Sequence, residues 1–201
     1  MEDKERRAQS PIRIWLKALV PSPANYGGIL VSAPSNVIVT GLAWLAIAAL
    51  VGFMLIALDF ILRGRIESEA IWLALRWGSL LSVLTIQLQV LVYAKLGNWL
   101  AHTLEYEGVF EDHFYLYAAF FTPLELIISP VFTLLAAQVD WQPIVSFALL
   151  SAPLHLYQYI LGATANQVLY KASMLDTILI TSPFLLGIVY DIAMMLVFRS
   201  L

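Results

Sequence analysis

The feature that most constrains this chain is a succession of apolar stretches, each long enough to cross a lipid bilayer. The first, residues 37–62, reads VIVTGLAWLAIAALVGFMLIALDFIL and holds one ionisable residue, Asp59, near its end. A helix needs about 20 apolar residues to cross roughly 30 Å of hydrocarbon. Comparable stretches follow, and we predict membrane spans at 37–62, 71–94, 114–137, 143–163 and 175–198.

The composition supports a membrane protein. Hydrophobic residues make up 61% of the 201 residues and charged residues only 12%, whereas soluble domains carry about a quarter charged residues. Backbone polar groups inside lipid must be paired within the chain, and separate apolar spans achieve this as helices. The predicted fold class is therefore all-α, a polytopic transmembrane helical bundle with five spans and a helix at the N-terminus.

The N-terminal part, residues 1–36, is predicted to lie outside the five-helix transmembrane domain at 37–199. Residues 1–10 are mostly charged or polar and form a tail. Ser10 followed by Pro11 is typical of a helix start, because serine can cap the free N–H groups and proline needs no donor in the first turn. We predict a helix over 11–20.

This helix has the pattern of one that lies on a membrane surface. Apolar residues recur at helical spacing on one face, and cations occupy another. The apolar face holds Ile12, Trp15, Leu16 and Leu19. We predict that Trp15, Arg13 and Lys17 anchor the helix to the membrane surface, with lipid as its partner.

The predicted connections are of two kinds. Residues 95–113 contain four acids and are expected to form a polar hairpin outside the hydrocarbon. Residues 138–142 are expected to form a very short turn, which would make the third and fourth spans an antiparallel helical hairpin.

Lysine and arginine predict the orientation, since these residues are enriched in cytosolic loops. A cytosolic N-terminus and an extracytoplasmic C-terminus leave four arginines on or near the outer side: Arg63, Arg65, Arg76 and Arg199. The same orientation places seven cations inside: Lys4, Arg6, Arg7, Arg13, Lys17, Lys95 and Lys171.

Placing an ionisable side chain in the hydrocarbon costs free energy, so such residues within the spans are expected to have polar partners. Glu125 lies near the middle of the third span and His155 near the middle of the fourth, with Gln158 one turn away. The hairpin makes Glu125 and His155 neighbours. One expectation is that they form a structural hydrogen bond between the two helices. The other is that they act as a proton relay or as a polar anchor for a ligand.

Arg76 and Asp191 form a second candidate pair. Both lie toward the outer ends of their spans, so a salt bridge could join the second helix to the fifth. The alternative is that the long side chain of Arg76 reaches the membrane interface alone.

No motif in the sequence indicates an enzyme. HExxH, GxSxG, phosphate-loop and intramembrane aspartyl-protease motifs are absent, and the chain contains no cysteine. One histidine with one carboxylate lacks the spacing of a metal site. A net charge of −3 gives no reason to expect nucleic acid. We therefore expect no catalytic residues, cofactor or metal.

Three segments carry a resemblance to a known family. The opening WLKALVPSPANY, the double-proline span AAFFTPLELIISPVFTLL and the exit LHLYQYILGATANQVLYKAS are similar to the bacterial branch of the Yip1-domain membrane proteins. The resemblance covers about residues 11–199. It implies a non-enzymatic scaffold or organiser that binds other membrane proteins or itself within the bilayer, in a bacterial plasma membrane.

A different class of function stays open. A small transporter, or a subunit of one, would use Glu125 and His155 as its polar site within the membrane. A cavity lined by both side chains would favour this alternative.

Overall fold

The computed structural model describes residues 9–62, 68–128 and 152–189, and every regular element in these ranges is helical. The elements are α1 (Pro11–Ala18), α2 (Pro23–Val31), α3 (Val37–Leu62), α4 (Ser68–Thr103), α5 (Phe110–Pro123), the π-helix η1 (Leu124–Ile128), α8 (Ala152–Tyr170), α9 (Met174–Thr181) and the 3₁₀-helix η3 (Ser182–Phe184). The predicted all-helical fold is confirmed for this part of the chain.

Two of these helices are long and apolar enough to cross a membrane, over Val37–Leu55 and Trp77–Thr103. The number becomes three if α8 and the helical segment Met174–Val189 count as one broken span; a bend of 119° separates them. The chain therefore has helices capable of spanning a membrane. The prediction of five spans remains a prediction.

The first predicted span agrees with α3 at both ends, because an uninterrupted apolar block dictates it. The predicted second span, 71–94, lies within α4, which begins at Ser68 and continues to Thr103. Residues 95–103 are thus helix and not part of a polar hairpin. Leu96, Leu100 and Ala101 provide the apolar periodicity that extends the helix, and Ala101 is fully buried.

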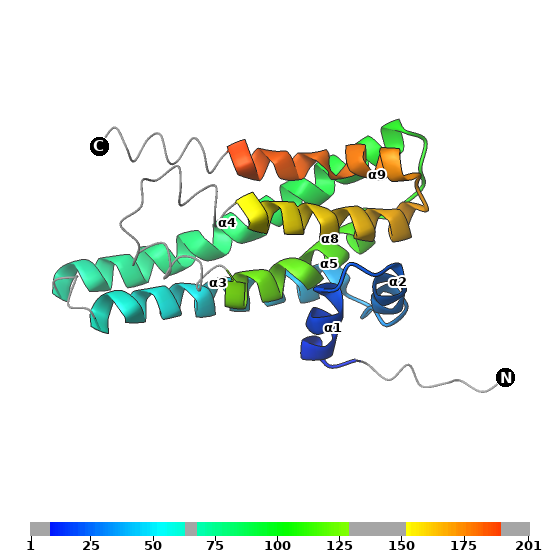
Figure 1. The fold of residues 1–201 in the computed structure, drawn as a ribbon. Helices are drawn as coiled ribbons and strands as arrows, with labels where there is room; N and C mark the ends of the chain where they lie inside the picture. The colour runs from blue at the N-terminus through cyan, green and yellow to red at the C-terminus, as the bar shows by residue number, and fades with distance from the viewer. Residues whose placement is uncertain (1–8, 63–67, 129–151, 190–201) are drawn as a thin grey trace.

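The later predicted spans are described in part. The third begins within α5 and continues as η1, and the fourth and fifth overlap α8 and the segment from α9 to Val189. Residues 129–151 and 190–201 lie outside the described part, and with them the predicted turn at 138–142. Figure 1 shows α8 and α9 lying side by side along the bundle axis.

Helix α5 lies at the centre of the bundle. It contacts α3, α4, α8, α1 and α2, and every residue from His113 to Pro123 is buried. Small residues let the neighbours approach: an added Cβ at Gly41 of α3 would lie 2.7 Å from the Phe114 ring. Aromatic rings fill the space between α5 and η3, where the ring centroids of Tyr117 and Phe184 are 5.0 Å apart.

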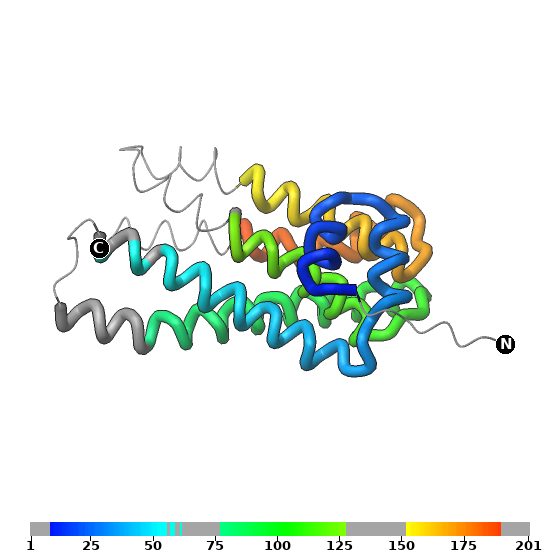
Figure 2. Tube along the Cα trace, turned by 90° about the horizontal axis from the view of Figure 1, so that it is seen from below, coloured from blue at the N-terminus to red at the C-terminus, as the bar shows by residue number. Residues whose placement is uncertain are grey.

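The short helices α1 and α2 are packed against this bundle. Both cross the direction of the long helices, as Figures 1 and 2 show from two sides. Helix α1 begins at Pro11 as predicted, and the Ser10 hydroxyl accepts a hydrogen bond from the Arg13 N–H at 3.4 Å. The Tyr26 hydroxyl of α2 donates to Ala18 O at 2.7 Å, and burial raises the pKa of Tyr26 well above its ordinary value.

Candidate functional site

Glu125 lies in η1, two residues after Pro123, the proline that ends α5. Pro123 has no N–H to donate, so the regular ladder is interrupted there and the next turn widens into a π-helix. Such π segments occur frequently at functional sites. Glu125 is half-buried in this segment.

His155 lies at the start of α8 and is also half-buried. Its Nδ1 lies 3.1 Å from Oε1 of the buried Gln158, one turn further along α8. Gly187 opposite leaves room for two side chains: a Cβ there would lie 3.2 Å from His155 Cε1 and 2.5 Å from the Tyr93 hydroxyl. His155, Gln158 and Tyr93 therefore gather where α4, α8 and the segment after η3 meet.

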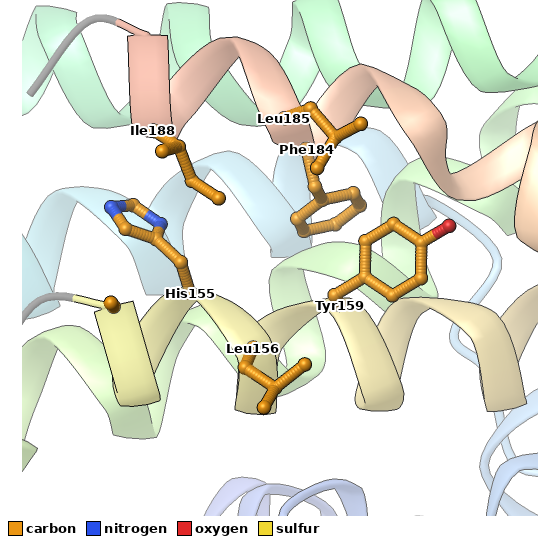
Figure 3. Close-up of a pocket in the computed structure, with 7 residues that line it drawn as sticks. His155, Leu156, Tyr159, Phe184, Leu185 and Ile188 are labelled. Carbon is orange, nitrogen blue, oxygen red and sulfur yellow. The ribbon is translucent and has the colours of Figure 1, made fainter. Parts of the chain in front are cut away.

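A cavity of about 210 Å³ adjoins His155 (Figure 3). Its walls are apolar apart from His155 and Tyr159, and the Tyr159 hydroxyl already donates to Ile178 O at 2.7 Å. Figure 3 shows the imidazole at one end of the cavity, near Ile188. Glu125 does not line it.

The predicted polar pairs have different outcomes. Gln158 does contact His155, while the hydrogen bond between Glu125 and His155 stays a prediction. Asp191 lies outside the described residues, and the side chain of Arg76 is likewise outside them, so their salt bridge also stays a prediction.

Two glutamines of α4 serve as local links. Gln87 donates to Leu42 O of α3 at 3.0 Å, and Gln89 donates to the Tyr93 hydroxyl at 3.0 Å. The Gln89 bond stays within α4, whereas the Gln87 bond joins two helices, and such bonds between membrane helices contribute roughly 0.6 kcal/mol on average.

A buried polar cluster, which the sequence did not predict, joins four helices. It comprises Asn98 of α4, His113 and Tyr117 of α5, Asn166 and Tyr170 of α8, and Thr181 of α9. The Tyr170 hydroxyl donates to Asn98 Oδ1 at 3.0 Å and lies 2.8 Å from His113 Nδ1. The Asn166 amide donates to both Tyr117 Oη and Thr181 Oγ1 at 2.9 Å.

A weak signal for the polar cluster is present in the sequence. His113 and Tyr117 are four residues apart, as are Asn166 and Tyr170, so each pair shares one face of its helix. His113 also follows an acidic run, which favours the interpretation of an exposed hairpin. The His113 imidazole is inside the bundle only because α5 packs at the centre of the bundle.

The predicted surface anchor Trp15 lies against the bundle. Its ring meets the Trp44 ring edge-on, with centroids 5.8 Å apart. Its Nε1 is enclosed by protein and has no hydrogen-bond partner among the described residues. Arg13 is exposed. Lys17 is half-exposed, and its Nζ donates to Gln9 Oε1 at 2.9 Å.

The outer side of α1 carries other apolar side chains. Ile12 and Leu16 are 64% and 62% exposed, and Val20 just beyond the helix is also exposed. Ile14 and Ala18 on the opposite side are buried. We call the exposed side, formed by Ile12, Leu16 and Val20, the outer face of α1.

Within the described residues, no three His, Asp or Glu side chains are grouped as a metal site would require. No protein-family model, curated protein or solved structure matches this chain. The Yip1 resemblance therefore stays a prediction from the sequence.

Proposed function

We propose that this chain is a non-enzymatic integral membrane protein that organises its surroundings in the bilayer, with α1 lying in one leaflet. The partners are lipid and other membrane proteins or further copies of the chain. The Yip1 resemblance of three sequence segments supports the same proposal.

The observation that carries the proposal is the placement of α1. This helix crosses the long helices and is fixed to them on its inner side by Ile14, Ala18 and Trp15. Its outer face is apolar and lies beside the cation Arg13. Helices of this kind lie in the membrane interface with the apolar face in lipid.

The same end of the bundle is proposed to face the cytosol. Lys171 lies in the connection from α8 to α9, and Lys95 Nζ lies 5.3 Å from the ring centroid of Phe110, the first residue of α5. Helices α1 and α2 pack at the same end of the bundle (Figure 1). Together with the charged N-terminal tail they fit a cytosolic N-terminus, an extracytoplasmic C-terminus and a plasma membrane location.

Single-cysteine labelling tests the placement of α1. The chain has no cysteine, so Leu16→Cys takes an environment-sensitive fluorophore at one point of the outer face. Glu107→Cys, in the exposed connection between α4 and α5, is the control. In liposomes the label at position 16 is expected to emit at shorter wavelength than the control and to be quenched several-fold more by nitroxide-bearing lipids.

Equal emission and equal quenching at the two positions would show that the outer face of α1 is in water. The proposed leaflet helix would then be wrong, since no lipid would cover Ile12 and Leu16. Because Leu16 is exposed, its replacement leaves the packing of the bundle unchanged.

A transporter is the second candidate, and the π-helix at Glu125 is the observation that favours it. The cavity beside His155 adds no support, because Glu125 does not line it. Irregular helix within a membrane bundle is tolerated where it is covered by protein or lines a cavity. The proposed substrate site would use the half-buried Glu125 and His155 as its polar groups.

Glu125→Gln and His155→Ala distinguish the two candidates. If both variants keep wild-type thermal stability in detergent and the same crosslinked partners but abolish growth function in the native host, the residues carry transport chemistry. The organiser proposal expects the opposite: any functional loss accompanies a lower melting temperature or a lost partner. Gln87→Leu, which removes only a link to α3, is the matched control for lost helix packing.

A further inference from the structure

The cavity beside His155 is bordered by exposed apolar side chains on both of the helical segments that form it. Leu156 of α8 and Leu185 of the segment after η3 line the cavity and are themselves exposed. Leu186 and Val189, next to Leu185 on the same segment, are exposed as well. An exposed apolar surface of this kind marks contact with a membrane or with another protein. Within the described part of the chain, the cavity opens toward the same surroundings as these side chains.

The cavity lies where the helix opposite α8 changes its geometry, at Pro183. Proline has no N–H to donate, and the preceding Ser182 N–H bonds to Leu179 O instead of to Ile178 O, as it would in a regular α-helix. The Ile178 carbonyl accepts the Tyr159 hydroxyl at 2.7 Å. This hydrogen bond holds the Tyr159 ring at one end of the cavity, as Figure 3 shows.

Phe184 forms the inner wall of the cavity and is only 4% exposed. Its ring is packed among other aromatic rings, with centroids 4.7 Å from Tyr93 and 5.6 Å from Phe121. Because these neighbours hold the ring, Phe184 cannot turn outward to fill the space. His155 lies at the other end, where its Nδ1 is 3.1 Å from Gln158 Oε1.

The size and the lining of the cavity suit a hydrocarbon. Its volume is about 210 Å³, and engineered cavities of about 150 Å³ lined by Leu, Ile and Phe stay dry and bind benzene. The Tyr159 hydroxyl is already hydrogen-bonded, and His155 is the other polar side chain in the wall. A polar ligand would therefore lose its hydrogen bonds to water for little return, whereas an apolar ligand loses none.

We propose that the cavity binds the end of one acyl chain of a membrane lipid, which enters between Leu156 and Leu185. The inference rests on the proposed function, because it requires that the bundle lies in a bilayer. In that setting the exposed apolar side chains around the opening face hydrocarbon, so acyl chains are the molecules in contact with it. Binding covers the Phe184 ring, which the lipids that merely surround the bundle do not reach.

Photocrosslinking of the full chain in liposomes tests the proposal. The probe is a phosphatidylcholine with a diazirine near the end of one acyl chain, and mass spectrometry locates the adducts. We expect Phe184 to be labelled to a similar extent as Leu186, which is 49% exposed and does not line the cavity.

The other outcomes separate this inference from the proposed function. Labelling of Leu186 without labelling of Phe184 would overturn the lipid site alone, and would mean that the cavity is empty or is filled by another part of the chain. Labelling of neither residue would overturn the membrane placement together with the site, since Leu186 contacts any hydrocarbon around the bundle.

Ile188→Trp narrows the cavity, because Ile188 lines it. The ratio of labelling at Phe184 to labelling at Leu186 is expected to fall several-fold in this variant. Val189→Trp is the matched control: Val189 is the next residue, is exposed and does not line the cavity, so the ratio should stay at the wild-type value. Equal ratios in the two variants contradict the proposal. If Ile188→Trp does not fold, the wild-type ratio still decides.

Discussion

Gly97→Ala is expected to destabilise the chain by about 1–3 kcal/mol, the usual cost of overpacking a buried site. The added Cβ would lie 2.6 Å from His113 Cε1 and 3.1 Å from the backbone oxygen of Ile180. The imidazole is held by Tyr170, and the Ile180 carbonyl belongs to α9, so neither neighbour can yield without moving a helix. The midpoint of thermal unfolding in detergent measures the effect.

Gly28→Ala is the matched control for this substitution. Gly28 lies within α2, and an added Cβ meets no atom within 4 Å. Alanine stabilises a helix interior relative to glycine by up to about 1 kcal/mol, so Gly28→Ala is expected to leave the melting temperature unchanged or raise it. If Gly28→Ala lowered the melting temperature as much as Gly97→Ala, the close contact at Gly97 would not be the cause of the destabilisation.

The sequence predicted the parts of the fold that are determined locally. The apolar block at 37–62 became α3 with the predicted bounds, and Ser10 with Pro11 marked the start of α1. Each of these depends on residues within one or two turns. The helical bundle could likewise be predicted, because apolar blocks of this length favour helices that are long enough to cross a bilayer.

The polar cluster could not be predicted, because its hydrogen bonds join distant parts of the chain. Tyr170 contacts Asn98, 72 residues earlier, and Asn166 contacts Tyr117, 49 residues earlier. Residues 95–113 were predicted to be a polar hairpin, so Asn98 was not expected inside the bundle either. A polar residue next to an acidic loop is usually exposed, and only the position of α5 at the centre of the bundle reverses this for His113.

The anchor residues of α1 show a different limit of sequence reasoning. Apolar residues occupy more than half of its circumference, so the local pattern allows more than one inner face. In the structure Ile14 and Ala18 form the inner face together with Trp15, while Ile12 and Leu16 stay outside. The predicted apolar face is therefore divided: Trp15 packs against the bundle, while Ile12 and Leu16 face away from it.

Trp15→Ala is expected to destabilise the chain by about 3 kcal/mol, the lower end of the range for removing a packed tryptophan, because the ring is only half-buried. The loss removes the edge-on contact with Trp44, whose ring in turn lies 5.3 Å from Tyr115 at the centre of the bundle. Helix α1 should then detach from α5, and the melting temperature in detergent should fall by several degrees.

Leu16→Ala, on the outer face of the same helix, provides the comparison. It is expected to change the stability in detergent by less than about 0.5 kcal/mol, as surface substitutions usually do. The two variants also differ in liposomes: Leu16→Ala should weaken only the contact of α1 with lipid, whereas Trp15→Ala should release the helix from the bundle and expose it to added protease. If Leu16→Ala is the more damaging of the two in detergent, the inner and outer faces of α1 are assigned the wrong way round, and Trp15 is the lipid anchor after all.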